Sequence, residues 1–321
     1  MNGEYVIGVD IGATWLRVGL SDVSGNILRK EKREIRTNHS YEVSEQIIDM
    51  VDYLFEETGL ETADLRGIGV ASAGPMNVNK GELVNPTNIP LEVVPLSKPL
   101  GQRFGVDVEL INDGASAVLA EQKFGEGQGY DNLVYITIST GIGGGAIVDG
   151  NLLYGKNGNA AEVGHFTIDQ AGELTCGCGR PGHWEAYCSG SNIPGFVKMH
   201  LAEITVYKGN SQLVKLDKEE LEGFEAKDLF DLARAGDELA EELVDELGRL
   251  NAIGFAAVTE AYDPALITVG GAVALHNPEM VLDPIRAKIH HYTQNEIPLI
   301  KITQLEEEVV LYGAIARALA I

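Results

Sequence analysis

The sequence predicts an α/β protein whose mixed β-sheets are covered by helices. Its first part combines an antiparallel run of strands with strand–helix units, an arrangement typical of mixed sheets. A second run of strand, glycine turn and strand follows later in the chain, which indicates an internal duplication. The length of 321 residues corresponds to roughly two domains of about 150 residues each. We therefore expect two α/β domains.

Hydrophobic periodicity predicts the elements of the first part. Apolar residues in the segment 42–58 recur at spacings of three and four, which predicts an amphipathic helix. A second helix, rich in alanine, is expected over residues 115–124. β-rich runs predict strands over residues 5–10, 16–21, 27–35, 65–71 and 106–111.

The second part repeats the pattern with longer helices. Strands are expected over residues 133–139, 145–148, 151–154 and 265–269, with a glycine turn at 140–144. Leucines at helical spacing predict a helix over 227–257, and small residues predict another over 311–319. The pattern is lost over 204–225, which we interpret as a loop or a peripheral insert.

Composition excludes several classes of protein. The chain carries 24 Lys and Arg against 48 Asp and Glu, a net charge of -24, so it repels nucleic-acid backbones. The apolar stretches are too short for a signal peptide or a membrane span. Three cysteines argue against a disulfide framework and for a reducing compartment. We expect a cytoplasmic protein with neither a nucleic-acid nor a membrane partner.

A glycine turn follows the first strand at residues 10–14. Gly12 lets the backbone approach a phosphate, Thr14 offers a hydroxyl, and the Asp10 carboxylate suits a magnesium ion held through water. An ordinary hairpin turn is the alternative interpretation.

A denser glycine run occupies residues 139–145. Four glycines in five positions sacrifice conformational entropy, which is easier to explain if exposed amides wrap an anion. The run matches the dinucleotide fingerprint formally, but that motif needs a strand followed by a helix, whereas here a strand follows. The chain has no Walker-type phosphate motif. A Rossmann dehydrogenase and a P-loop enzyme are therefore disfavoured.

A candidate general base lies where a buried strand passes into a helix, at Asn112-Asp113. Asp113 there suits the acceptance of a proton from an attacking hydroxyl, the role of aspartate in phosphoryl transfer to alcohols. The alternative is a helix N-cap, a position that Asp and Asn favour.

The strongest local signal is a Cys and His cluster. Cys176, Cys178 and His183 follow His165 in a glycine-rich stretch, and two thiolates with two imidazoles form a complete tetrahedral zinc set. Such a set leaves no open position for a catalytic water, so we interpret it as structural. Two small thiols and two unrelated histidines are the alternative, and Cys188 is expected to be a core residue.

Polar side chains surround this cluster in the sequence. Glu162 precedes His165 by three residues, and Glu185 follows His183 by two. A zinc site that fixes these side chains would suit a polyol, while solvated surface carboxylates are the alternative.

Taken in order, these motifs resemble the ROK (repressor, open reading frame, kinase) family over essentially the whole chain. The segments that carry the resemblance are Asp10-Ile-Gly-Ala-Thr14, Asn112-Asp-Gly-Ala115, Thr140-Gly-Ile-Gly-Gly-Gly145, Glu162-Val-Gly-His165, Cys176-Gly-Cys-Gly-Arg-Pro-Gly-His-Trp-Glu-Ala186 and Thr268-Val-Gly-Gly271.

The resemblance implies an actin-like ATPase (ribonuclease H-like) fold of two α/β domains around a cleft. The expected domains are residues 1–111, completed by a C-terminal helix at about 307–321, and residues 112–306, which include the zinc loop. A homo-oligomer, dimer or tetramer, is also expected.

For the nucleotide, the resemblance implies ATP with magnesium bridging its phosphates. The phosphates would lie between the two glycine turns and the adenosine near Gly270-Gly271. The implied nucleotide residues are Asp10, Gly12, Ala13, Thr14, Thr140, Gly141, Gly143, Gly144, Gly270 and Gly271.

For the sugar, the resemblance implies Asp113 as the base. Asn112, Glu162, His165 and Glu185 would bind the ring together with Asp113, and Gly74 and Asn88 would lie nearby. His165 would serve zinc with one ring nitrogen and the sugar with the other. The family usually has a third cysteine where this chain has His183, so we expect a zinc site of two Cys and two His.

The expected reaction is ATP-dependent phosphorylation of the 6-hydroxyl of a hexose, most simply glucose. An N-acetylhexosamine such as N-acetylglucosamine or N-acetylmannosamine is the alternative substrate. A sugar-binding regulator without catalysis is a second class, and an actin-like assembling ATPase a third. DNA-binding repressors of the family carry an extra N-terminal domain, and a first strand near Tyr5 with a charge of -24 argues against that function.

Overall fold

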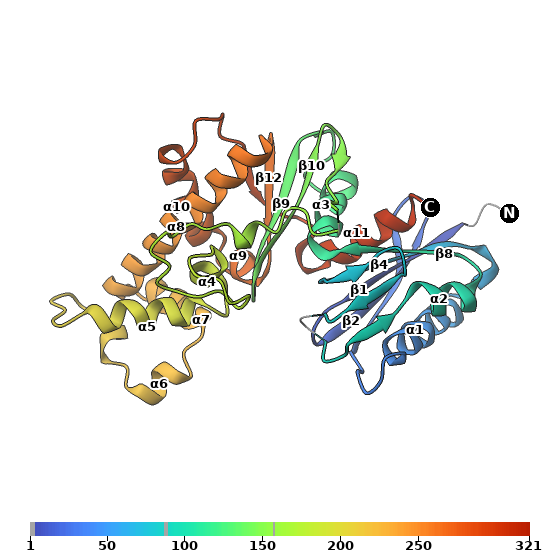
Figure 1. The fold of residues 1–321 in the computed structure, drawn as a ribbon, viewed down its shortest axis with the longest axis horizontal. Helices are drawn as coiled ribbons and strands as arrows, with labels where there is room; N and C mark the ends of the chain where they lie inside the picture. Colours follow the sequence, from blue (N-terminus) through green and yellow to red (C-terminus); the bar gives the residue numbers. More distant parts are fainter. Residues whose placement is uncertain (1–3, 87–88, 157) are drawn as a thin grey trace. The chain divides into compact units, whose positions relative to one another are not determined.

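The computed structural model describes residues 4–86, 89–156 and 158–321 (Figure 1). Contacts divide the chain into two compact units. The first consists of Met1–Asp131, Gly145–Ala161 and Glu307–Ile321, and the second of Asn132–Gly144 and Glu162–Glu306. Each unit combines a β-sheet with helices, as the α/β prediction requires.

The first unit is built on a five-stranded mixed sheet. Its strands, in spatial order, are β3 (Ile27–Glu34), β2 (Trp15–Asp22), β1 (Tyr5–Ile11), β4 (Leu65–Ser72) and β8 (Asp107–Asn112). β1 pairs antiparallel with β2 and parallel with β4, which in turn pairs parallel with β8. The expected antiparallel run and strand–helix units therefore form one sheet.

Helices cover both faces of this sheet (Figure 1). On one face, Ile7, Val9 and Ile11 of β1 join a buried cluster with apolar residues of α1 (Glu42–Thr58) and α2 (Ser97–Phe104). On the other face, Val6 packs against α11 (Val309–Ala318), and α3 (Asp113–Phe124) packs against α11 in turn. A small sheet of β5 (Met76–Asn77), β6 (Glu82–Val84) and β7 (Val93–Pro95) completes the unit.

A second five-stranded sheet begins in the second unit. Its order is β11 (Asn151–Leu152), β10 (Ile142–Val148), β9 (Leu133–Ile138), β12 (Leu266–Gly270) and β13 (Leu299–Ile302). β12 lies parallel to both β9 and β13. The boundary between the two units falls inside β10. The first residues of β10 belong to the second unit and its last residues belong to the first.

The second unit contains most of the helices. They are α4 (Glu185–Cys188), α5 (Ile193–Glu203), α6 (Lys218–Glu222), α7 (Ala226–Arg234), α8 (Glu238–Tyr262), α9 (Ala272–His276) and α10 (Pro278–Lys288). The long α8 contacts α4, α7 and α10 and buries Leu243, Leu247 and Phe255. It is the helix around which this unit packs.

Three elements differ from the sequence expectations. The helix expected over 227–257 is two helices, α7 and α8, because Gly236 between them has a φ of 82° and Asp237 caps α8. β10 starts at Ile142, inside the glycine run expected to be a turn. The segment 204–225, expected as a loop or a peripheral insert, is not a plain loop, because it contains the short helix α6.

Contacts also place α3 in the first unit, whereas the expected larger domain began at residue 112. The reason is its packing on α11, where the Ser116 hydroxyl donates to the Val310 carbonyl at 2.9 Å. The C-terminal segment Glu307–Ile321 belongs to this first unit as well.

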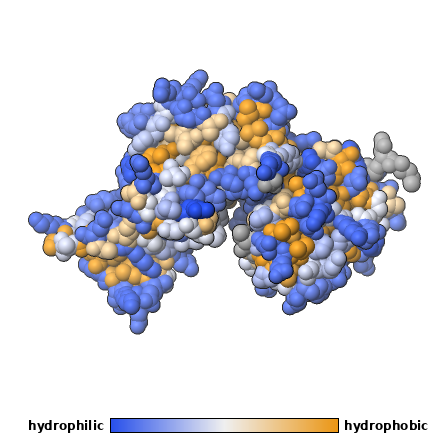
Figure 2. Space-filling model, in the orientation of Figure 1, coloured by the Kyte–Doolittle hydropathy of each residue, from blue (hydrophilic) through white to orange (hydrophobic). Residues whose placement is uncertain are grey.

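Hydrophilic residues cover most of the face shown in Figure 2, with smaller hydrophobic areas between them. Within the described ranges, no helix combines the length and the apolar character needed to cross a membrane.

The crossing of α11 and α3 yields a stability prediction. A Cβ added at Gly313 would lie 1.8 Å from the Ser116 carbonyl oxygen, so Gly313→Ala must push two helices apart. We expect a loss of about 2 kcal/mol or more of unfolding free energy, measured by urea denaturation. Gly195→Ala in α5, where an added Cβ meets nothing within 4 Å, is the control and should not destabilise. Equal stability of Gly313→Ala and the parent protein would contradict this packing.

Candidate functional site

In the first unit, candidate residues gather at the carboxyl ends of three adjacent strands. The register pairs Ile11 of β1 with Ser72 of β4, and Ser72 with Asn112 of β8. Asp10 lies one residue before the end of β1. Because parallel strands end at one edge of a sheet, the topology brings Asp10 and Asn112 to the same edge, where α/β proteins bind ligands.

The first glycine turn lies at this edge. The Gly12 amide donates to the Trp15 carbonyl at 3.0 Å, which closes the turn between β1 and β2. Ala13 and Thr14 are exposed, so the turn offers its backbone and the Thr14 hydroxyl to solvent. The geometry is that of a hairpin turn, and it leaves these groups available to a ligand.

Asp10 is buried, with 6% of its surface exposed, and its carboxylate accepts a hydrogen bond from Arg17 at 2.8 Å. Burial raises the pKa of Asp10 to about 6, against the lowering effect of Arg17, and the nearby Asp113 carboxylate adds to the rise. The sequence reasoning missed Arg17. Correct pairing of the first two predicted strands would have revealed it, because Arg17 stands opposite Asp10 in the antiparallel register.

Asn112, not Asp113, is the N-cap of α3. The Asn112 side-chain oxygen accepts from the amides of Gly114 at 2.9 Å and Ala115 at 3.4 Å. This assigns the capping role to the neighbour of the candidate base.

Asp113 is the first residue of α3 and is half-buried. Its Oδ1 accepts from the Gly114 amide at 2.7 Å, and no side chain in the described residues donates to its carboxylate. Desolvation raises the pKa of Asp113 above its usual value, against the lowering effect of backbone amides. A carboxylate with a raised pKa at a sheet edge has the properties of a general base.

Of the two neighbouring sugar candidates, Gly74 follows the end of β4 by two residues and therefore lies beyond the same sheet edge. Asn88 lies outside the described residues.

In the second unit, the second glycine turn joins β9 and β10. Ser139 donates its amide to the Gly141 carbonyl at 2.9 Å, and Ser191 donates to the exposed Thr140 carbonyl through its amide and its hydroxyl. Gly143 and Gly144 lie inside β10 itself. The residues of this motif are therefore partly a turn and partly a strand.

Gly270 and Gly271 lie beside that turn. Gly270 pairs with Thr137 in the parallel register of β12 and β9, so both motifs occupy the carboxyl edge of this sheet. The Ala272 amide, at the start of α9, lies 3.4 Å from the Ser139 hydroxyl. The structure brings the 139–141 turn and Gly270-Gly271 together within one unit.

Glu185, at the start of α4, connects the turn to the cysteine cluster. Its Oε2 accepts from the Ile142 amide at 2.9 Å, and its Oε1 lies 3.1 Å from the Cys176 sulfur. A Cβ added at Gly141 would lie 2.6 Å from Oε2, so a larger residue there would displace this carboxylate from its present position. Glu185 is thus tied to the protein, in contrast to a solvated surface carboxylate.

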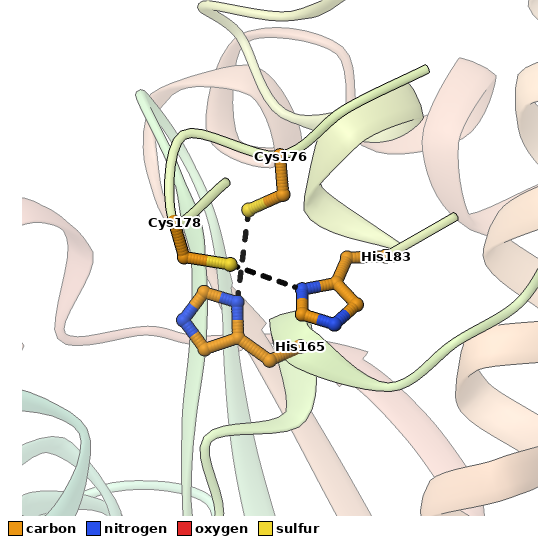
Figure 3. Close-up of side chains that lie close together, drawn as sticks. All are labelled: His165, Cys176, Cys178 and His183. Atoms are coloured by element: carbon orange, nitrogen blue, oxygen red, sulfur yellow. Dashed lines mark hydrogen bonds between the residues drawn. The ribbon is translucent and has the colours of Figure 1, made fainter. Parts of the chain in front are cut away.

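His165, Cys176, Cys178 and His183 form a compact cluster with their side chains turned toward one another (Figure 3). The four candidate ligand atoms all lie within 4.8 Å of one another. Cys176 Sγ lies 3.7 Å from His165 Nδ1, and Cys178 Sγ lies 3.3 Å from His183 Nδ1. Two sulfurs and two imidazole nitrogens converging in this way suit a tetrahedral metal ion.

His165 ends the short 3₁₀ turn Val163–His165, which Glu162 precedes. This turn is pressed against β10, because a Cβ at Gly164 would lie 2.0 Å from the Ile142 carbonyl oxygen. Glu162 is exposed. Glu162, His165 and Glu185 are therefore all positioned by segments that contact the start of β10 or the cysteine cluster.

Trp184 fixes the segment between His183 and Glu185. It is fully buried, and its indole Nε1 donates to Asn251 of α8 at 2.8 Å. The sequence reasoning gave no role to Asn251, since a lone amide in a long helix carries no distinguishing pattern. Cys188 is buried with 1% exposure, as expected for a core residue.

Each unit contains its own set of candidate groups. The first unit holds a glycine turn and two carboxylates. The second unit holds a glycine turn, the cluster of four candidate metal ligands and further carboxylates. The structure is similar over 98% of this chain and 97% of the other to a ROK hexokinase from Thermus thermophilus, with a TM-score of 0.83 and 30% identity. The fold is that of the actin-like ATPases.

The chain belongs to the ROK family, whose family model matches residues 6–320. A glucokinase from Aeropyrum pernix is 35% identical over 291 residues, which cover 89% of this chain and 88% of that protein. A ROK family glucokinase from Streptomyces griseus, solved in complex with glucose and AMPPNP, has a TM-score of 0.75 and 32% identity over 98% of this chain and 99% of the other. The family and fold expectations are confirmed.

Proposed function

We propose that this protein is an ATP-dependent hexose kinase that phosphorylates the 6-hydroxyl of glucose. The observation that carries the proposal is Asp113, a desolvated carboxylate at the start of α3 whose capping role is taken by Asn112. Family membership and the glucokinase relatives support the same reaction class.

In the proposed mechanism, Asp113 accepts the proton of the sugar hydroxyl as its oxygen attacks the terminal phosphorus of ATP. A new oxygen–phosphorus bond forms, the bond to the bridging oxygen breaks, and ADP leaves. The raised pKa of Asp113 makes its carboxylate a stronger base than an ordinary aspartate, which favours removal of the hydroxyl proton.

The proposed nucleotide residues are the two glycine turns with Asp10, Gly270 and Gly271. The exposed residues Ala13 and Thr14 of the first turn suit contacts with phosphate oxygens. Magnesium, when bound with ATP, would reduce the charge that opposes attack. The Asp113 carboxylate is close enough to Asp10 to raise the pKa of Asp10. Two carboxylates at one sheet edge suit a hydrated cation.

For the sugar we propose Asn112, Asp113, Glu162, His165 and Glu185, with Gly74 nearby. The hydrogen bonds of Glu185 to Ile142 and toward Cys176 would fix its carboxylate before a sugar arrives. Fixed acceptors lose little entropy when a ligand binds, which favours specific recognition of hydroxyls.

The direct test is ATP consumption coupled to sugar-phosphate formation with magnesium. The panel is glucose, mannose, fructose, N-acetylglucosamine and N-acetylmannosamine. We expect glucose to give the highest kcat/KM. A preference for an N-acetylhexosamine would keep the reaction class and replace the substrate, whereas sugar binding without ATP consumption would identify a regulator.

Asp113→Asn should lower kcat by about 10²- to 10⁴-fold while sugar affinity changes little, because only proton transfer is lost. In the parent protein, kcat/KM should rise with pH through an acid limb above the usual aspartate range, since the base acts when ionised and desolvation raises the pKa of Asp113. Asp107→Asn, at the opposite end of the same strand, is the control and should remain active. Substantial turnover by Asp113→Asn would refute the assignment of the base.

We also propose that the cluster holds one structural zinc ion. Metal analysis of the purified protein should find about one zinc per chain, and Cys178→Ser or His183→Ala should lower that content markedly. Cys188→Ala should retain the metal, because Cys188 is buried away from the cluster against the Leu247 carbonyl. Absence of zinc, with ready alkylation of Cys176 and Cys178, would count against the site.

A further inference from the structure

A positively charged side chain lies beside the first glycine turn, and none of the carboxylates in the described residues forms an ion pair with it. The ammonium of Lys32 lies over the ring of Trp15, 4.7 Å from the ring centre. Trp15 follows Thr14 directly, and its carbonyl closes the turn by accepting from the Gly12 amide. Lys32 therefore lies against Trp15, whose carbonyl closes the turn proposed to contact phosphates.

The strand register explains this placement. Arg17 of β2 stands opposite Lys32 of β3, and Asp10 of β1 stands opposite Arg17. Cross-strand partners share a face of the sheet, and Trp15 shares that face because it is two residues from Arg17. Asp10, Trp15, Arg17 and Lys32 therefore line one face near the carboxyl end of β1.

The positively charged residues on this face differ in whether they form an ion pair. Arg17 forms an ion pair with Asp10, and Lys30, two residues before Lys32, forms one with Glu308. No carboxylate in the described part of the chain lies within 4.0 Å of the Lys32 ammonium, although Glu34 stands on the same face opposite Trp15. Trp15 is 43% exposed, so the cation that rests on it faces water.

We propose that Lys32, held on the ring of Trp15, is a nucleotide-binding residue that contacts the polyphosphate of ATP. The inference rests on the proposed kinase function and deepens it. A protein with a net charge of -24 repels a polyanion, so a cation placed at the phosphate turn has a disproportionate local effect. Trp15 acts as a positioning residue, because its ring restricts where the ammonium can lie.

The kinetic test compares variants of two neighbouring lysines. Lys32→Met should raise the KM for ATP about fivefold and leave kcat and the KM for sugar within about twofold, because the contact serves nucleotide binding alone. Lys32→Arg should retain most of the ATP affinity. Lys30→Met is the matched control, since it removes one positive charge from the same strand and face, and it should leave the KM for ATP unchanged. Potassium chloride should raise the KM for ATP more steeply in the parent protein than in Lys32→Met.

A binding measurement separates this inference from the proposed function. The chain has two tryptophans, and Trp184 is fully buried whereas Trp15 is exposed. Magnesium-ATP should therefore change the fluorescence of Trp15, with a Kd about fivefold higher in Lys32→Met, and Trp15→Phe should abolish the response. Equal Kd and KM values in Lys32→Met and the parent protein would overturn the role of Lys32 and leave the kinase proposal standing. Failure of the parent protein to bind ATP would overturn both.

Discussion

The arrangement of the first unit depends on very close contact between α11 and the backbones around it. A Cβ at Gly69 of β4 would lie 2.0 Å from the Ala314 carbonyl oxygen, and Gly313 faces Ser116 of α3 in the same way. α11 is thereby in contact with the sheet on one side and with α3 on the other. Since Asp113 is the first residue of α3, the position of the proposed base is set by packing between backbones, which tolerates little adjustment.

The second unit uses a single carboxylate for a comparable purpose. Glu185 accepts from the first amide of β10 and lies beside the Cys176 sulfur, while the adjacent Trp184 is fixed by Asn251. The cluster, the glycine turn and the carboxylate therefore support one another. A group held from several directions loses less freedom when a ligand arrives, which is the usual way in which a binding site gains selectivity.

The sequence predicted the local elements well wherever a strong period was present, as in the helix at Glu42–Thr58. The prediction failed where the backbone conformation depends on a single residue or on a neighbouring strand. The leucine pattern runs across Gly236 without a break, so the end of α7 was not visible in it, and the strand character of Ile142–Val148 comes from pairing with β9. Motif order indicated the family and its candidate residues. The sequence did not indicate the roles of Arg17, Asn251 and Lys32, because these roles arise from cross-strand and helix contacts that a linear motif does not record.

Strand β10 has a consequence for how the chain can change in length. Its first amide is bound by Glu185, and three residues later a Cβ at Gly145 would lie 2.1 Å from the carbonyl oxygen of Gly114, which follows Asp113. Successive residues of a strand point to opposite faces, so inserting or deleting one residue here would turn every later side chain to the wrong side. The number of residues between Ile142 and Gly145 is therefore fixed as firmly as their identities. Changes in length are expected to accumulate in surface segments such as 204–225 instead.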